Sequence, residues 1–172
     1  MHLIVQTDFE LTRLDLLAKI TARKRLQGAD LMQGNERPEQ PGQSESPEPS
    51  ERTLYELVGG EETFRRLVNS FYARVEADPV LRPLFPDDME AGKRWQFLFL
   101  SQFFGGPTAY AEERGHPRLK MRHFPFAIDQ QARDHWLRHM LTAIDDVGIE
   151  EPMRSVMTDY FERASTFMIN KE

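Results

Sequence analysis

The segment that decides the interpretation of this chain is Gly115–Phe126, which reads GHPRLKMRHFPF. Pro117 is well placed as the first residue of a helix, because its missing N–H would have had no intrahelical partner anyway. Pro125 disfavours helical geometry at the preceding residue, so the predicted helix ends at His123 and is only about seven residues long. An isolated helix needs roughly 12–15 residues to be even marginal in water. Tertiary contacts or a bound ligand must therefore hold this helix.

His123 lies in the last turn of this short helix, among apolar neighbours in the sequence. Such a position suggests an axial ligand to a flat apolar cofactor. A lone histidine is more often a partly buried, hydrogen-bonded core residue, so this segment alone leaves both interpretations open. The apolar neighbours are Met121, Phe124 and Phe126.

The composition excludes several classes of site. The chain has 172 residues and no cysteine, so disulfides, thiolate zinc sites, iron–sulfur clusters, thiolate-ligated haem and cysteine nucleophiles are all absent. A formal net charge of −6 argues against a nucleic-acid partner. No apolar run approaches the roughly 20 residues that span a bilayer. The first residues lack a basic region, and Asp8 and Glu10 interrupt any apolar one, so we expect a cytoplasmic protein.

Composition divides the chain into three parts. Residues 1–31 form an N-terminal extension with the amphipathic pattern of a helix. Residues 32–52 are rich in Pro, Glu and Ser, which is typical of a flexible linker. Residues 53–172 carry a dense series of helical patterns and no alternating strands. The apolar positions in the extension are Leu11, Leu14, Leu17 and Ile20.

Within residues 53–172, helix-start and helix-stop signals predict four long helices beside the short one. Thr53–Val58 is expected to form a short helix before Gly59–Gly60, and Tyr110 is expected to lie in a loop. Four long helices cannot close a core around a seven-residue fifth unless something fills that space. The long helices are expected over about 61–77, from Asp87 or Asp88 to Phe104, from the cap Asp129 to near Gly148, and from Pro152 to about 169.

These patterns, taken in order, resemble the group II truncated haemoglobins. The resemblance implies an all-α two-over-two helical sandwich that encloses haem b (iron protoporphyrin IX), in which 61–77 and 88–104 pack across 130–147 and 152–169. The motifs that carry it are Phe71-Tyr72-Ala73-Arg74-Val75, Leu84-Phe85-Pro86, Gly105-Gly106-Pro107, Gly115-His116-Pro117 and Met121-Arg122-His123-Phe124-Pro125-Phe126, followed by Trp136.

On the proximal side of the haem, the family's iron-ligating histidine matches His123, which would bind through Nε2. Its other ring nitrogen needs a partner that fixes the tautomer, and we expect a backbone carbonyl in the short helix. Arg122 is expected either to neutralise a haem propionate or to be a solvated surface cation.

On the distal side, Tyr72 matches the family's B-helix tyrosine and Trp136 its G-helix tryptophan. Each offers one donor to a diatomic ligand, although either residue can instead serve only packing. Phe85 occupies the corner position and can wedge the haem without donating a hydrogen bond. Gln96 is the third expected polar group.

The register of the helix over 88–104 decides whether Gln96 faces the haem. Anchoring on Gly105-Gly106-Pro107 places Gly92, Gln96, Phe99, Leu100 and Phe103 on the haem face; a one-residue slip places Lys93, Phe97, Leu100 and Phe104 there. We prefer the first register, in which Gly92 takes the place where many globins carry a distal histidine. The expected haem contacts are then His123, Arg122, Phe85, Gly92, Phe99, Leu100, Met121, Phe126 and Ile128.

Within residues 53–172, three further histidines lie outside this scheme. His135 and His139, four residues apart, can bind a divalent metal with Asp146 or another carboxylate. Because they flank the inner face of their helix, we expect a solvated surface instead. His116 is expected to contact neighbouring loops and not to act as a ligand.

The resemblance implies reversible binding of oxygen and other diatomic gases by a monomer or homodimer. The alternative is a haem redox enzyme, a nitric oxide dioxygenase or a peroxidase-like protein, which would need a separate reductase because the chain contains no reductase domain. A remote alternative is a cofactor-free helical interaction domain.

Overall fold

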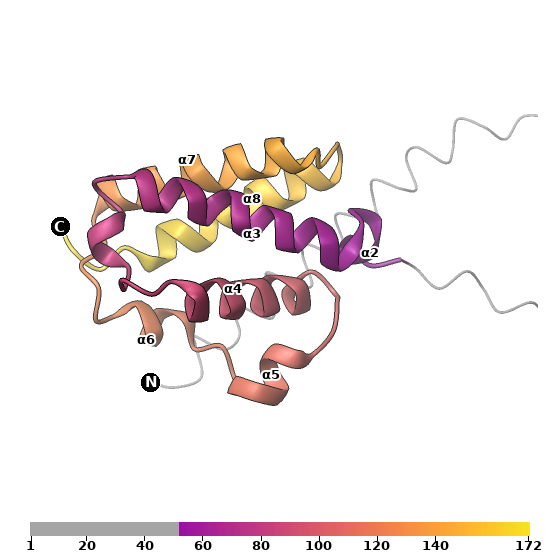
Figure 1. The fold of residues 1–172 in the computed structure, drawn as a ribbon, viewed down its shortest axis with the longest axis horizontal. Helices are drawn as coiled ribbons and strands as arrows, with labels where there is room; N and C mark the ends of the chain where they lie inside the picture. The colour runs from indigo at the N-terminus through magenta and orange to yellow at the C-terminus, as the bar shows by residue number, and fades with distance from the viewer. Residues whose placement is uncertain (1–51) are drawn as a thin grey trace, which may run out of the picture. The chain divides into compact units, whose positions relative to one another are not determined.

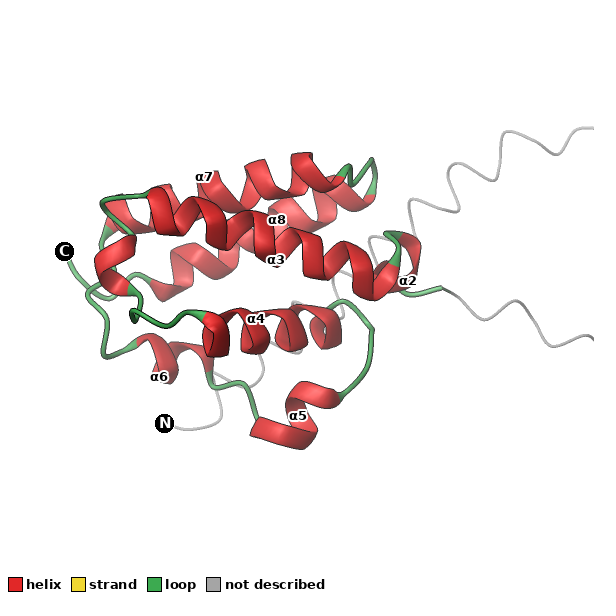
Figure 2. Ribbon diagram, viewed as in Figure 1, coloured by secondary structure: helices red, strands yellow, loops and turns green. Residues whose placement is uncertain are grey.

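The computed structural model describes residues 52–172, so the predictions for residues 1–51 lie outside the described part. Helices joined by loops and turns make up that part, and no strand occurs in it (Figure 2). None of its helices combines the length and the apolar character that a membrane span requires. The helices are α2 (Leu54–Leu57), α3 (Gly60–Ala77), the 3-10 helix η2 (Arg82–Leu84), α4 (Glu90–Phe103), α5 (Ala109–Arg114), α6 (Leu119–His123), α7 (Gln130–Val147) and α8 (Met153–Met168).

The four long helices pack as two pairs, α3 with α4 and α7 with α8, and this arrangement confirms the predicted sandwich. Helix α3 contacts both α4 and α7, and α7 in turn contacts α8. In Figure 1, α3 runs between α7 and α4, and α5 and α6 lie on the α4 side. The core consists of side chains at helical spacing on the inner faces. Those with no exposed surface are Phe64, Leu67, Phe71, Val75, Met140, Ala143 and Met157.

The long helices begin and end close to the predicted residues, because local capping signals fix them. The Asp129 carboxylate accepts a hydrogen bond from the Ala132 N–H at 2.8 Å, as expected of an N-cap. Gly148 ends α7 at φ 75°, a left-handed conformation that favours glycine. For α4, the predicted aspartate cap is wrong. Met89 is the N-cap residue, and Asp88 accepts only from the nearby Glu90 N–H at 2.9 Å.

Two predictions between α4 and α7 are also wrong. The expected loop around Tyr110 contains helix α5, and Tyr110 is buried against Trp95 and Phe99 with ring centroids 6.1 and 5.5 Å away. Helix α6 starts at Leu119, two residues later than predicted. The reason is that Arg118 adopts the left-handed conformation at φ 44°, which separates Pro117 from the helix.

Candidate functional site

His123 ends α6 in a geometry suited to metal ligation. Its Nδ1 lies 2.7 Å from the carbonyl oxygen of Leu119, one turn earlier in the same helix. A carbonyl can only accept, so Nδ1 carries the proton and Nε2 keeps a free lone pair when the ring is neutral. The hydrogen bond to a carbonyl of the short helix is therefore confirmed, and it leaves Nε2 available to a ligand.

Two residues brace the segment around His123. The Arg122 guanidinium donates from Nε to the Pro117 carbonyl at 2.8 Å and from Nη2 to the Arg114 carbonyl at 3.4 Å, so it ties α6 to the turn before it. Its contact with a propionate stays a prediction. Asn170, which follows α8, donates from Nδ2 to the Phe126 carbonyl at 2.9 Å and to the His123 carbonyl at 3.3 Å. No sequence motif indicates this role for Asn170, because its partners lie more than 40 residues earlier in the chain.

Tyr72 and Gly92 meet where α3 approaches α4. Tyr72 is 3% exposed, and burial raises the pKa of its phenol above the ordinary value, so the hydroxyl stays protonated. A Cβ at position 92 would lie 2.8 Å from Tyr72 Oη, so the hydroxyl fills the space that this glycine leaves open. Gln96 follows Gly92 by four residues and so occupies the same face of α4. This contact agrees with the preferred register.

Aromatic rings connect the η2 corner to α7. The Tyr72 ring lies edge-on to Phe85 at 5.8 Å and edge-on to Phe71 at 5.5 Å, and Phe71 lies 5.2 Å from Trp136. Within residues 52–172, no hydrogen bond engages the Tyr72 hydroxyl, the Trp136 indole N–H or the Gln96 amide. Three helices thus supply polar groups that remain available to a small ligand.

The other predicted haem contacts occupy different environments. Phe99 and Leu100 are buried in α4, whereas Met121 and Phe126 are 63% and 42% exposed beside His123. Phe103 stacks on Tyr160 at 4.1 Å, so it packs between α4 and α8. Phe104, which belongs to the rejected register, packs in the core against Phe64 at 5.7 Å. The contact of these residues with haem remains a prediction.

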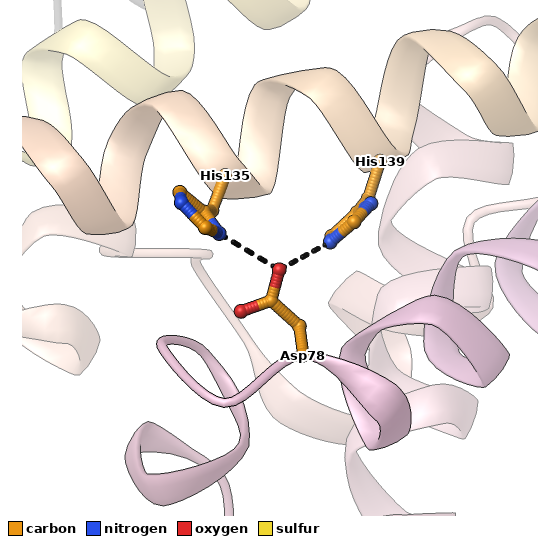
Figure 3. A group of neighbouring side chains, drawn as sticks. All are labelled: Asp78, His135 and His139. Carbon is orange, nitrogen blue, oxygen red and sulfur yellow. Dashed lines mark hydrogen bonds and ion pairs between the residues drawn. The ribbon is translucent and has the colours of Figure 1, made fainter.

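A second cluster joins the end of α3 to α7. His135 Nδ1 and His139 Nε2 lie 2.8 and 2.6 Å from the same oxygen, Asp78 Oδ2 (Figure 3). The expected solvated surface is therefore wrong, because Asp78 is buried and both rings are only partly exposed. Asp146 is not their partner. It accepts from the Ser70 hydroxyl at 2.5 Å and pairs with Arg74 at 2.7 Å.

The Asp78 carboxylate is held on both oxygens. Oδ1 accepts from the N–H groups of Val80 and Leu81 at 2.8 and 3.0 Å. Burial would raise the pKa of this carboxyl, but the hydrogen bonds from His135, His139 and these two N–H groups outweigh it and hold the pKa well below its usual range. Asp78 is therefore ionised at neutral pH.

We expect Asp78→Asn to lower the free energy of unfolding at pH 7 by about 2–3 kcal/mol, because hydrogen bonds to a charged group contribute about 1.5–3 kcal/mol each. The pKa of Asp78 is lower in the folded than in the unfolded state, where it is about 3.9. The ionised carboxylate therefore stabilises the fold fully above pH 3.9, and this contribution is lost as the pH falls towards the folded-state pKa. The difference between variant and wild type should therefore shrink below about pH 4. Urea unfolding at pH 7 and pH 3 measures this difference in the free energy of unfolding, with EDTA present to remove any metal ions. Glu76→Gln, which alters an exposed carboxylate near the end of α3, is the control. Equal differences between Asp78→Asn and wild type at both pH values would contradict the prediction.

Comparison with known proteins places this arrangement in a family. Residues 53–170 match the bacterial-like globin family. A group 2 truncated hemoglobin of Bacillus subtilis is 43% identical over 117 residues, covering 68% of this chain and 88% of that protein. The crystal structure of a hemoglobin from Chloroflexus aurantiacus is 60% identical with a TM-score of 0.70, covering 70% of this chain and all of that one. The structure of a truncated oxygen-avid haemoglobin from Bacillus subtilis is 42% identical with a TM-score of 0.66, covering 69% of this chain and all of that one.

The globin family implies a haem cofactor, and the donor set present here fits one. His123 has Nδ1 fixed on the Leu119 carbonyl, which leaves Nε2 for a metal, and Gly92 leaves room for the Tyr72 hydroxyl. With the helical sandwich and the matches in sequence and structure, the conclusion is that this chain belongs to the bacterial-like globins, as a group II truncated haemoglobin.

Proposed function

We propose that this globin binds oxygen and other diatomic gases reversibly at haem b, with His123 as the axial ligand of the iron. The observation that carries the proposal is the hydrogen bond between His123 Nδ1 and the Leu119 carbonyl at 2.7 Å. It directs the basic Nε2 away from α6, and a hydrogen bond of this kind both orients a ligating histidine and raises its basicity.

When bound, haem would supply an iron atom able to bind a diatomic gas. On the proximal side, His123 would hold that iron, and Arg122 is proposed to reach a propionate while its Nε stays on the Pro117 carbonyl. Apolar side chains would exclude water from the two faces of the ring. We assign this role to Phe85, Phe99, Leu100, Met121, Phe126 and Ile128.

On the distal side, Tyr72, Trp136 and Gln96 are proposed to donate hydrogen bonds to the bound gas. The Tyr72 hydroxyl is protonated because burial raises its pKa, and an indole N–H can only donate. The missing side chain of Gly92 makes room for the Tyr72 hydroxyl. The oxygen-avid character in the name of the Bacillus subtilis relative supports oxygen as the gas.

The absorption spectrum of the purified full-length protein tests this function. We expect a haem spectrum that changes on reduction with dithionite, changes again on addition of oxygen, and returns when oxygen is removed over repeated cycles. A colourless protein that takes up no haem would contradict the proposal. So would immediate oxidation on every exposure to oxygen with catalytic consumption of nitric oxide, which would indicate the redox enzyme instead.

A further inference from the structure

Three side chains at the junction of α3 and α7 present metal-ligating atoms to one point. His135 Nδ1, His139 Nε2 and one carboxylate oxygen of Asp78 all lie within 4.8 Å of one another. Figure 3 shows both imidazoles, one helical turn apart on α7, directed at the carboxylate. We propose that Asp78, His135 and His139 bind one divalent cation of the zinc class. These three residues are not among those assigned to the haem site, so the proposal does not depend on the proposed function.

The chemistry of the three groups selects the cation. Two imidazole nitrogens and one carboxylate oxygen are typical ligands of Zn²⁺, and three protein ligands leave a fourth tetrahedral position for water. Imidazole also favours Ni²⁺ and Cu²⁺, whereas Mg²⁺ and Ca²⁺ prefer all-oxygen sites. Each imidazole nitrogen that faces the carboxylate can present a lone pair to a cation when the neutral ring carries its proton on the other nitrogen.

The backbone orients the site before any cation arrives. The Val80 and Leu81 N–H groups hold Asp78 Oδ1, which leaves Oδ2 to face the two imidazoles. Ligand atoms about 2.0–2.1 Å from a tetrahedral Zn²⁺ lie about 3.3 Å apart. The present nitrogen–oxygen distances of 2.8 and 2.6 Å therefore need to open by about 0.5 and 0.7 Å. Side-chain rotation of two partly exposed histidines can supply that change.

One group opposes the cation. Arg138 Nη2 lies 3.0 Å from His135 Nδ1 and 3.7 Å from Asp78 Oδ2. Its side chain is 59% exposed, so it can turn into solvent when a cation binds. Because a like charge at this distance lowers cation affinity, Arg138→Gln should bind the cation more tightly than wild type, by about fivefold.

Isothermal titration of the full-length, haem-loaded protein with zinc chloride at pH 7.5 tests the proposal. We expect wild type to bind one Zn²⁺ at this site. His135→Ala and His139→Ala should each lower the affinity for Zn²⁺ at least about tenfold. His116→Ala, which alters an exposed histidine outside the cluster, should leave the affinity unchanged. Zn²⁺ should raise the melting temperature of wild type but not of His139→Ala, because only a folded-state ligand stabilises the fold.

X-ray absorption at the zinc edge gives a readout that does not depend on the stability of the variants, and it should show two imidazole ligands. No binding to wild type below 1 mM Zn²⁺ would overturn the proposal. Equal binding by wild type and both histidine variants would also overturn it, and so would an Arg138→Gln affinity below that of wild type.

Discussion

His123→Gly is expected to abolish the histidine–haem spectrum of this globin. The variant removes the imidazole proposed as the iron ligand, whose Nδ1 is fixed on the Leu119 carbonyl and whose Nε2 is left for a metal. The reduced variant should lose the iron–histidine stretching band in resonance Raman spectra. Imidazole added to the solution should restore it, because the cavity left by the side chain admits the free ligand.

His116→Gly is the matched control, since it removes an exposed histidine seven positions earlier in the same segment. Its spectrum should equal that of wild type. A His123→Gly protein that keeps the native spectrum without imidazole would show that another residue ligates the iron, and the proposed site would be wrong.

The long helices were predictable because each carries many repeats of one signal. In α3 and α7, apolar residues recur at helical spacing over 18 residues, and cap residues such as Asp129 and Gly148 mark the ends. Helix α5 has six residues and one buried side chain, Tyr110, so it shows no repeat that a sequence pattern can reveal. The left-handed conformation of Arg118 could not be predicted either, since arginine has no preference for positive φ.

The surroundings of His123 could be predicted from the sequence, whereas the cluster of Asp78, His135 and His139 could not. The His123 partner is local, because a histidine at the end of a short helix has a carbonyl of the preceding turn within reach. Asp78 lies 57 residues before His135 and 61 before His139. Only the packing of α3 on α7 brings them together, so the helical pattern of α7 alone predicted a solvated surface.

Tyr72→Phe and Trp136→Phe are each expected to speed oxygen release. A hydrogen bond to a charged or strongly polarised acceptor contributes about 1.5–3 kcal/mol, and about 1.4 kcal/mol corresponds to a tenfold change, so each loss should raise the dissociation rate constant at least about tenfold. Tyr72→Phe removes only the hydroxyl and keeps the ring against Phe71 and Phe85, so the fold should be unaffected. Stopped-flow mixing of the oxygenated protein with dithionite measures the rate constant.

Tyr55→Phe is the control, because this ring stacks on Phe64 at 5.4 Å at the far end of α3 and has no contact with Gly92. If Tyr72 and Trp136 donate to the same oxygen molecule, the two losses should not add in the double variant, since the remaining donor repositions the ligand after the first loss. Simple additivity would indicate independent donors. Unchanged rate constants in both single variants would contradict a distal role for either residue and would leave Gln96 as the remaining candidate donor.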